Sequence, residues 1–140
     1  MNDHSISKEL QARLLATARA ARKHAYAPYS KFLVGAAGLD EKGRIHAGCN
    51  VENAAYPQGV CAEAGALSAM ALAGGRKARA VAVVGAGAKW VTPCGGCRQK
   101  LREFGKPDLP ILIASPTRLH TTLSLDELLP YSFGPDHLKP

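Results

Sequence analysis

The segment Cys61-Ala-Glu-Ala-Gly-Ala-Leu-Ser-Ala-Met-Ala-Leu-Ala-Gly-Gly75 is alanine-rich and closes on two glycines, which is typical of a helix and its C-terminal cap. The β-branched run Arg79-Ala-Val-Ala-Val-Val84 predicts a short buried strand. It is followed by Pro93-Cys-Gly-Gly-Cys-Arg-Gln-Lys-Leu-Arg-Glu-Phe104, whose proline stands where a helix start tolerates it best. We therefore expect a helix from Cys61 to Ala73, a strand from Arg79 to Val84 and a helix from about Gly95 to Phe104, a succession typical of an α/β fold.

The rest of the chain adds elements on both sides of this unit. Apolar residues at three- and four-residue spacing predict an amphipathic helix from Ser5 to about Ala25. The other expected elements are a hairpin of strands Phe32–Leu39 and Arg44–Val51 around the turn Asp40–Gly43, a loop Asn53–Val60, strands Leu109–Ala114 and Leu119–Leu123, and a helical turn Leu125–Leu129. This order predicts a helix-covered sheet that begins with an antiparallel hairpin and continues with parallel strands joined by helical crossovers.

Composition limits the class of protein. The chain has 140 residues, 46% of them hydrophobic and 21% charged, which indicates one globular domain over residues 1–140 and excludes disordered or collagen-like chains. The net charge of +7 would suit nucleic acid, but the basic residues are scattered and the few aromatic residues do not interleave with them, so we expect no stable nucleic-acid partner. We see no secretory signal and no apolar run of membrane-spanning length, and we expect a cytoplasmic protein without membrane association.

Three cysteines stand at two predicted helix starts. Cys61 begins one helix, and Cys94 and Cys97 begin the other, 94 − 61 = 33 residues later. Helix starts that follow strands of one sheet converge at its edge, and thiolates are soft ligands that suit zinc, so three of them leave a fourth position open for water. Glu63 beside such a site suits proton transfer during hydrolysis. The residues alone also allow a redox Cys-x-x-Cys pair or a closed structural zinc site with Cys49 as fourth ligand.

The Cys-Ala-Glu and Pro-Cys-Gly-Gly-Cys-Arg-Gln segments resemble those of the zinc-dependent nucleoside deaminases. Three further segments resemble cytidine deaminase motifs in the right order: Tyr26-Ala-Pro-Tyr-Ser-Lys-Phe32, Gly48-Cys-Asn50-Val-Glu52-Asn-Ala-Ala-Tyr56 and Glu127-Leu-Leu-Pro-Tyr-Ser-Phe133. The short chain, with cysteine at position 61, is similar to the small homotetrameric branch. The resemblance implies a three-layer α-β-α fold with a mixed sheet of about five strands and an N-terminal antiparallel hairpin.

The resemblance also implies roles for individual residues. Cys61, Cys94 and Cys97 would hold one Zn²⁺ per subunit, and Glu63 would carry protons while water replaces the amino group of cytidine or deoxycytidine. The residues implied in substrate binding are Asn50 and Glu52 on the ribose, Phe32 in the pocket wall, and Tyr56 and Phe133 reaching a neighbouring subunit's active site. The implied function is hydrolytic deamination in pyrimidine salvage by a homotetramer that binds a nucleoside.

One position departs from the pattern of this family. Small cytidine deaminases usually carry arginine after the catalytic glutamate, where it offsets the negative thiolates, whereas this chain has Ala64. We hypothesise that Arg98 and the two helix dipoles take over this task. Two other functions stay open, namely deamination of a modified cytosine nucleoside of the blasticidin type and a nucleic-acid-binding zinc module.

Overall fold

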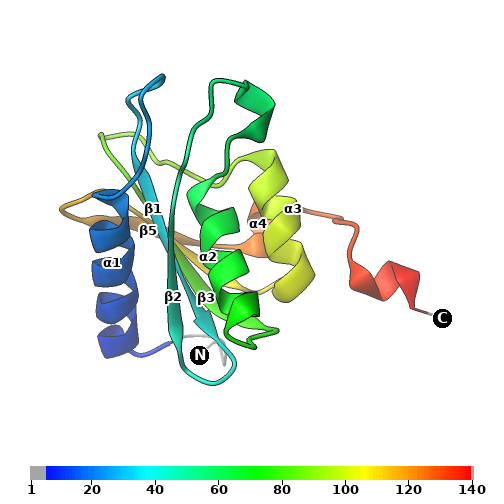
Figure 1. Ribbon diagram of the computed structural model, residues 1–140. Coiled ribbons are helices and arrows are strands. Elements are labelled where there is room, and N and C mark those ends of the chain that lie inside the picture. The colour runs from blue at the N-terminus through cyan, green and yellow to red at the C-terminus, as the bar shows by residue number, and fades with distance from the viewer. Residues whose placement is uncertain (1–5, 140) are drawn as a thin grey trace.

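The computed structural model describes residues 6–139 of the chain (Figure 1). The helices are α1 (Lys8–Arg22), α2 (Ala62–Leu72), α3 (Gly95–Phe104) and α4 (Leu125–Leu128), and the strands are β1 (Val34–Asp40), β2 (Ile45–Cys49), β3 (Ala78–Gly85), β4 (Pro110–Ala114) and β5 (Leu119–Ser124). Two short 3₁₀ turns, η1 (Tyr56–Gln58) and η2 (Pro135–Leu138), complete the described chain. The expected elements are confirmed in this order, and the bounds of α3 agree with those predicted.

The first helix is shorter than predicted. Ser7 caps its start by accepting a hydrogen bond from the Leu10 N–H, whereas the predicted start at Ser5 lies outside the described residues. The helix ends at Arg22 because Tyr26 is drawn into backbone pairing: its N–H donates to the Asn50 carbonyl, and its own carbonyl accepts from the Glu52 N–H. The alanines after Arg22 continue the helical pattern but cannot oppose this tertiary pairing.

The five strands form one mixed sheet in the order β2-β1-β3-β4-β5. The early hairpin β1–β2 is antiparallel, and β3 and β4, joined through α3, are parallel, as predicted. The expectation that all later strands run parallel is wrong for β5, which pairs antiparallel with β4. The physical reason is the connection of residues 115–118 between them, which is too short for a crossover and makes a turn instead.

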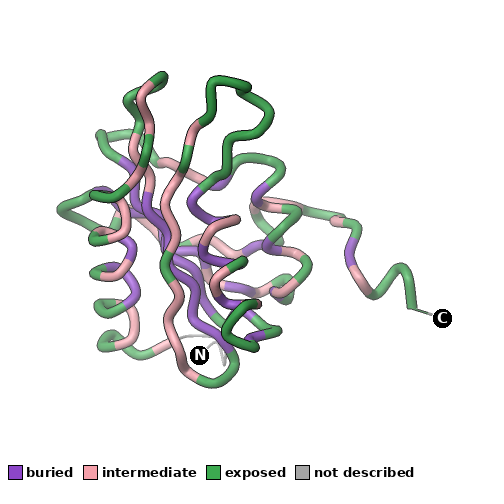
Figure 2. Tube along the Cα trace, in the orientation of Figure 1, coloured by how far each residue is buried: buried purple, intermediate pink, exposed green. Residues whose placement is uncertain are grey.

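Helices cover both faces of the sheet, giving three layers. On one face α1 packs Leu14, Leu15 and Ala18 against the alternate residues of β1 and β3. On the other face α2 and α3 pack against a cluster that includes Val83 and Ile111. Figure 2 shows the buried residues concentrated between these layers. None of the helices in residues 6–139 is both long and apolar enough to cross a bilayer.

The second helix lies unusually close to strand β2. A Cβ atom built on Gly48 would lie 2.3 Å from the Ala62 carbonyl oxygen and 2.3 Å from the Ala66 nitrogen. Gly65 faces back toward the strand, and a Cβ there would lie 3.4 Å from the Gly48 Cα. Because only glycine at position 48 permits this contact, Gly48 fixes how deeply the first turn of α2 sits on the sheet.

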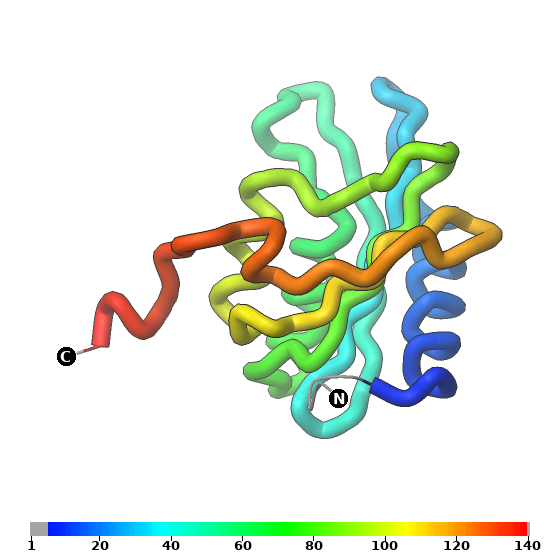
Figure 3. Tube along the Cα trace, turned by 180° about the vertical axis from the view of Figure 1, so that it is seen from behind, coloured from blue at the N-terminus to red at the C-terminus, as the bar shows by residue number. Residues whose placement is uncertain are grey.

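Two loops project beyond the sheet at the end where α2 and α3 begin (Figure 1). They comprise residues 26–33 and 53–60, and we call them the projecting loops. Beyond α3, on the side away from α1, residues 130–139 project from the body of the molecule, and we call this segment the C-terminal arm (Figure 3). Both features expose aromatic side chains outside the core.

Candidate metal and catalytic centre

The structure brings the three predicted ligand cysteines together. Cys61 and Cys94 are the N-cap residues of α2 and α3, both with extended backbone, and Cys97 is buried in the first turn of α3. Their sulfur atoms all lie within 4.8 Å of one another, and the Sγ atoms of Cys61 and Cys94 are 3.9 Å apart. Tetrahedral zinc at about 2.3 Å from each sulfur requires neighbouring sulfurs about 3.8 Å apart, so the group fits zinc. Cys49 lies on β2 and is not part of this group.

The electrostatics of the cluster call for a cation. Burial raises the pKa of the Cys97 thiol, and the neighbouring Glu63, Cys61 and Cys94 raise it further. Burial also raises the pKa of Cys61, whereas the Cys97 backbone N–H lowers the pKa of Cys94. Three thiolates this close repel one another, so they coexist only when a bound cation compensates their charge.

Glu63 lies in the first turn of α2, two residues after Cys61, and is only 5% exposed. Burial raises the pKa of its carboxyl group, while the Cys97 thiol and the positive charge of Lys100 act in the opposite direction. A buried carboxyl with a raised pKa, next to three potential zinc ligands, is suited to accept and return a proton. The structure therefore shows Glu63 buried beside the cysteine group, and its role in proton transfer stays a prediction.

Arg98, the predicted compensating cation, donates its hydrogen bonds to oxygen atoms of three other residues. Its guanidinium donates to the Pro93 carbonyl at 2.7 Å, to the Leu128 carbonyl at 2.8 Å and to the Thr92 hydroxyl at 3.1 Å. These bonds tie the loop that carries Cys94 to the end of α4. Arg98 thus positions a ligand-bearing loop, and its contribution to charge compensation stays a prediction.

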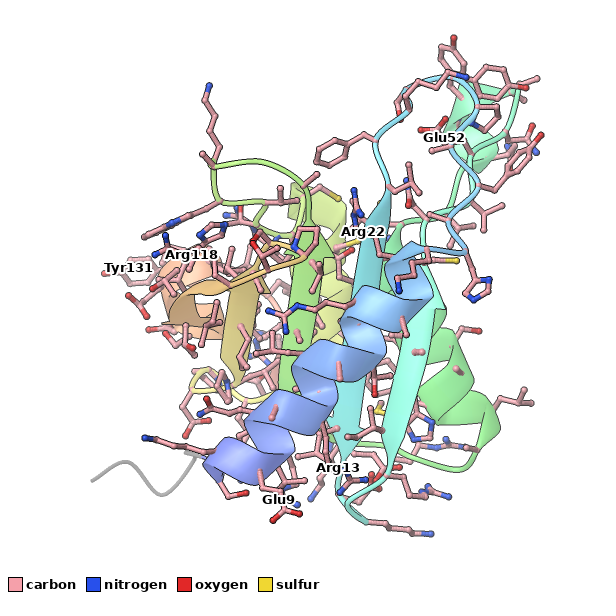
Figure 4. The ribbon with its side chains drawn as sticks, turned by 90° about the vertical axis from the view of Figure 1, so that its left-hand side faces the viewer. Glu9, Arg13, Arg22, Glu52, Arg118 and Tyr131 are labelled. Carbon is pink, nitrogen blue, oxygen red and sulfur yellow. The ribbon has the colours of Figure 1, made fainter. Side chains whose placement is uncertain are left out.

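The predicted ribose-binding residues lie at the base of the projecting loops. The Asn50 side chain accepts from the Val34 N–H and donates to the Phe32 carbonyl. The Glu52 carboxylate accepts from the backbone N–H groups of Tyr29 and Ser30 and from the Ser30 hydroxyl, and these bonds lower its pKa. Figure 4 shows Glu52 between the two loops. Both side chains therefore shape the 26–33 loop, and Glu52 stays charged.

The predicted aromatic contacts are exposed in the single chain. Phe32 is 43%, Tyr56 75% and Phe133 55% exposed. Tyr56 contacts Tyr29 with ring centroids 5.9 Å apart, and both rings line a depression between the projecting loops. Phe133 lies on the C-terminal arm, where its ring stacks on His137 and its carbonyl accepts from the Gln99 side chain. The structure does not bring Phe133 to the Tyr56 depression within one chain.

Two residues near the centre escaped the sequence analysis. Ser30 holds the Glu52 carboxylate, a partnership across 22 residues that no local pattern reveals. Lys100 acts on Glu63, and its only sequence signal is its helical spacing of three residues from Cys97. A large groove elsewhere on the surface, lined by residues such as Arg79, Glu103 and Lys106, mixes basic and acidic groups and offers no comparable chemistry.

Comparisons with known proteins agree with this geometry. The family profile described as "Cytidine and deoxycytidylate deaminase zinc-binding region" matches residues 8–113. A cytidine deaminase of Sporosarcina psychrophila is 40% identical over 126 residues, which cover 90% of this chain and 93% of the relative. A cytidine deaminase of Mycobacterium tuberculosis is 45% identical over 114 residues, which cover 81% of this chain and 82% of the relative.

A solved structure supports the same assignment. The crystal structure of cytidine deaminase from Burkholderia pseudomallei superimposes with a TM-score of 0.83 and 42% sequence identity, covering 91% of this chain and 100% of that one. In this chain the cysteine group lies at the starts of α2 and α3, inside the segment that the family profile matches. On this combined evidence, the chain belongs to the cytidine and deoxycytidylate deaminase family.

Proposed function

We propose that this protein hydrolyses cytidine and deoxycytidine to uridine and deoxyuridine with release of ammonia. The observation that carries the proposal is the buried Glu63 beside the sulfur atoms of Cys61, Cys94 and Cys97. The relatives of this chain in Sporosarcina psychrophila and Mycobacterium tuberculosis are named cytidine deaminases. Such an enzyme serves pyrimidine salvage, and we place it in the cytoplasm.

The three cysteines would hold one zinc ion, which supplies Lewis acidity and makes water a competent nucleophile at neutral pH. Glu63 then performs the proton transfers. Its carboxylate accepts a proton from the attacking water and delivers it to N3 of the cytosine ring as the oxygen bonds to C4. Glu63 next takes the remaining proton from the hydroxyl on C4 and delivers it to the amino group; the bond from C4 to nitrogen breaks as the C4 carbonyl forms, and ammonia leaves. Atoms balance as cytidine plus water giving uridine plus ammonia.

The ribose contacts are proposed at the projecting loops. Asn50 offers an amide and Glu52 a charged carboxylate, a pair that can accept and donate hydrogen bonds to a diol. Because both already hold the 26–33 loop, that loop is prepared for the sugar before substrate arrives. Phe32 supplies an apolar ring at the end of the same loop. Preordering of this kind lowers the entropic cost of binding.

A second copy of the chain would complete the site. Tyr56 and Phe133 are not core residues in the single chain, since each is more than half exposed. Aromatic side chains exposed in this way are typical of interfaces between protein chains. We propose a homotetramer in which these two residues reach a neighbouring active site. Mixing inactive Glu63→Ala chains with inactive Phe133→Ala chains tests this, because shared sites regain activity in the mixed assembly.

The function is tested by the ultraviolet absorbance change on mixing the purified protein with cytidine or deoxycytidine, with Glu63→Ala as control. Conversion by the parent protein alone supports the proposal. If neither nucleoside reacts while zinc is bound, the proposal is refuted, and modified cytosine nucleosides are tried next. Salt-dependent binding of polynucleotide without deamination would instead indicate a nucleic-acid-binding zinc module.

A further inference from the structure

The C-terminal arm is attached to the body along one side of α3. The Gln99 side chain donates a hydrogen bond to the Phe133 carbonyl at 2.9 Å. Arg102 follows three residues later on the same helix, and its guanidinium donates to the Ser132 hydroxyl at 2.8 Å and to the Asp136 carboxylate at 2.7 Å. These two acceptors lie on either side of Phe133 in the chain, so Arg102 grips the arm around that residue.

The guanidinium of Arg102 fits closely into the arm. The Arg102 side chain is only 13% exposed, although its partner Asp136 is 66% exposed. A Cβ atom built on Gly134 would lie 2.2 Å from the Cζ atom of Arg102 and 2.3 Å from one of its terminal nitrogens. The guanidinium therefore occupies the space that a side chain at position 134 would need. Because an arginine fork fixes direction as well as distance, this contact sets the course of the arm.

The arm is also strained where it begins. Tyr131 is fully exposed and has a φ of 54°, a left-handed conformation that tyrosine adopts rarely. Such a backbone persists only where the surrounding contacts hold it, and the bond from Arg102 to Ser132 holds the next residue. Further out, the exposed Phe133 ring stacks on His137 with ring centroids 5.0 Å apart. The arm thus has a defined conformation in the single chain.

We propose that Arg102 is a positioning residue, which holds the C-terminal arm so that Phe133 is presented to the active site of a neighbouring subunit. The inference rests on the proposed function, in which Phe133 completes that site. A segment that is held before association loses less conformational freedom when it binds. Loss of the Arg102 contacts should therefore weaken the neighbour's site while leaving the cysteine group and Glu63 of its own chain intact.

The first test is steady-state kinetics with cytidine. Arg102→Gln should lower kcat/KM by about 10-fold or more, because it removes charge-assisted hydrogen bonds to the arm, and it should keep the zinc content of the parent. Arg102→Lys should fall between the two, since an ammonium can pair with Asp136 but lacks the fork. Gly134→Ala displaces the guanidinium and should act like Arg102→Gln, and the double variant should lose little more. Arg79→Gln, the same change at an exposed arginine of β3, should behave like the parent.

Mixed assemblies separate positioning from a general structural effect. Arg102→Gln chains co-expressed with Glu63→Ala chains should regain activity, because an intact centre in one chain then meets an intact arm from the other. Arg102→Gln chains co-expressed with Phe133→Ala chains should regain none, because every arm in that assembly is impaired. A variant whose own centre is damaged would not regain activity with Glu63→Ala.

The outcomes distinguish the inference from the proposed function. Parental kcat/KM in Arg102→Gln, no regained activity with Glu63→Ala, or regained activity with Phe133→Ala would overturn the role of Arg102 alone. Parental activity in Phe133→Ala would overturn the role of the arm and, with it, the inference. A parent protein that does not deaminate cytidine or deoxycytidine would overturn the proposed function as well.

Discussion

Gly48→Ala tests whether the close packing of α2 on β2 sets the geometry of the catalytic centre. The new methyl carbon would lie 2.3 Å from the Ala62 oxygen and the Ala66 nitrogen, while ordinary contact begins near 3.4 Å. Both are backbone atoms that cannot rotate away, so α2 must shift by about 1 Å. The shifted segment begins next to Cys61 and carries Glu63. A misplacement of about 1 Å commonly costs about 10²-fold in rate, and overpacking about 1–3 kcal/mol of stability.

The assay combines kcat/KM for cytidine, zinc content and denaturant unfolding. Gly65→Ala is the matched control on the facing helix, because its methyl carbon would lie 3.4 Å from the Gly48 Cα, an ordinary contact. Gly38→Ala is a second control, on β1, where a Cβ meets nothing within 4 Å. We expect both controls to keep zinc and activity. If purified Gly48→Ala retains one zinc per chain and kcat/KM within about threefold of the parent, the reasoning is wrong.

Three further predictions concern the scaffold around the centre. Asp40 is fully buried and accepts hydrogen bonds from Arg44 and His46; burial raises its pKa, but hydrogen bonds from His46, Arg44 and Lys42 outweigh this and hold the pKa well below its ordinary value. Asp40→Asn should therefore lower the free energy of unfolding by about 2–4 kcal/mol. In the parent, this stabilisation should be complete above about pH 4 and be lost as the pH falls toward the depressed pKa of Asp40. A difference in unfolding free energy between parent and variant that stays the same at all pH values would contradict this. Arg98→Ala frees the loop before Cys94 and should weaken zinc retention in chelator competition, with little dependence on salt; unchanged retention refutes the role. Ser30→Ala removes a hydrogen bond to Glu52 and should raise KM for cytidine about 2- to 10-fold at nearly constant kcat. An unchanged KM would contradict the proposed role of Glu52 in sugar binding.

The central part of the fold could be predicted because its signals are local. Pro93 and Gly105 flank α3, and the bounds Gly95–Phe104 follow from them directly. The cysteine group could also be predicted, since helix starts after strands of one sheet meet at one edge. These features depend on residues close in sequence or on a general rule of topology.

The rest depends on contacts between distant residues. The direction of β5 follows from the turn at Ser115, whose backbone N–H donates to the Arg118 carbonyl, and apolar spacing does not contain that information. The hydrogen bond from Arg98 to Leu128 spans 30 residues, so the sequence pattern does not reveal that Arg98 ties the loop of Cys94 to α4.

The central claim is that Glu63 moves protons at a centre whose metal is held by Cys61, Cys94 and Cys97. The most direct measurement compares zinc content and cytidine turnover in Glu63→Ala and Cys94→Ala with those of the parent. We predict that Glu63→Ala keeps one zinc per chain and loses about 10² to 10⁴ in rate, while Cys94→Ala loses the metal and the activity together. Near-normal turnover in Glu63→Ala, or full zinc content and activity in Cys94→Ala, would contradict the account.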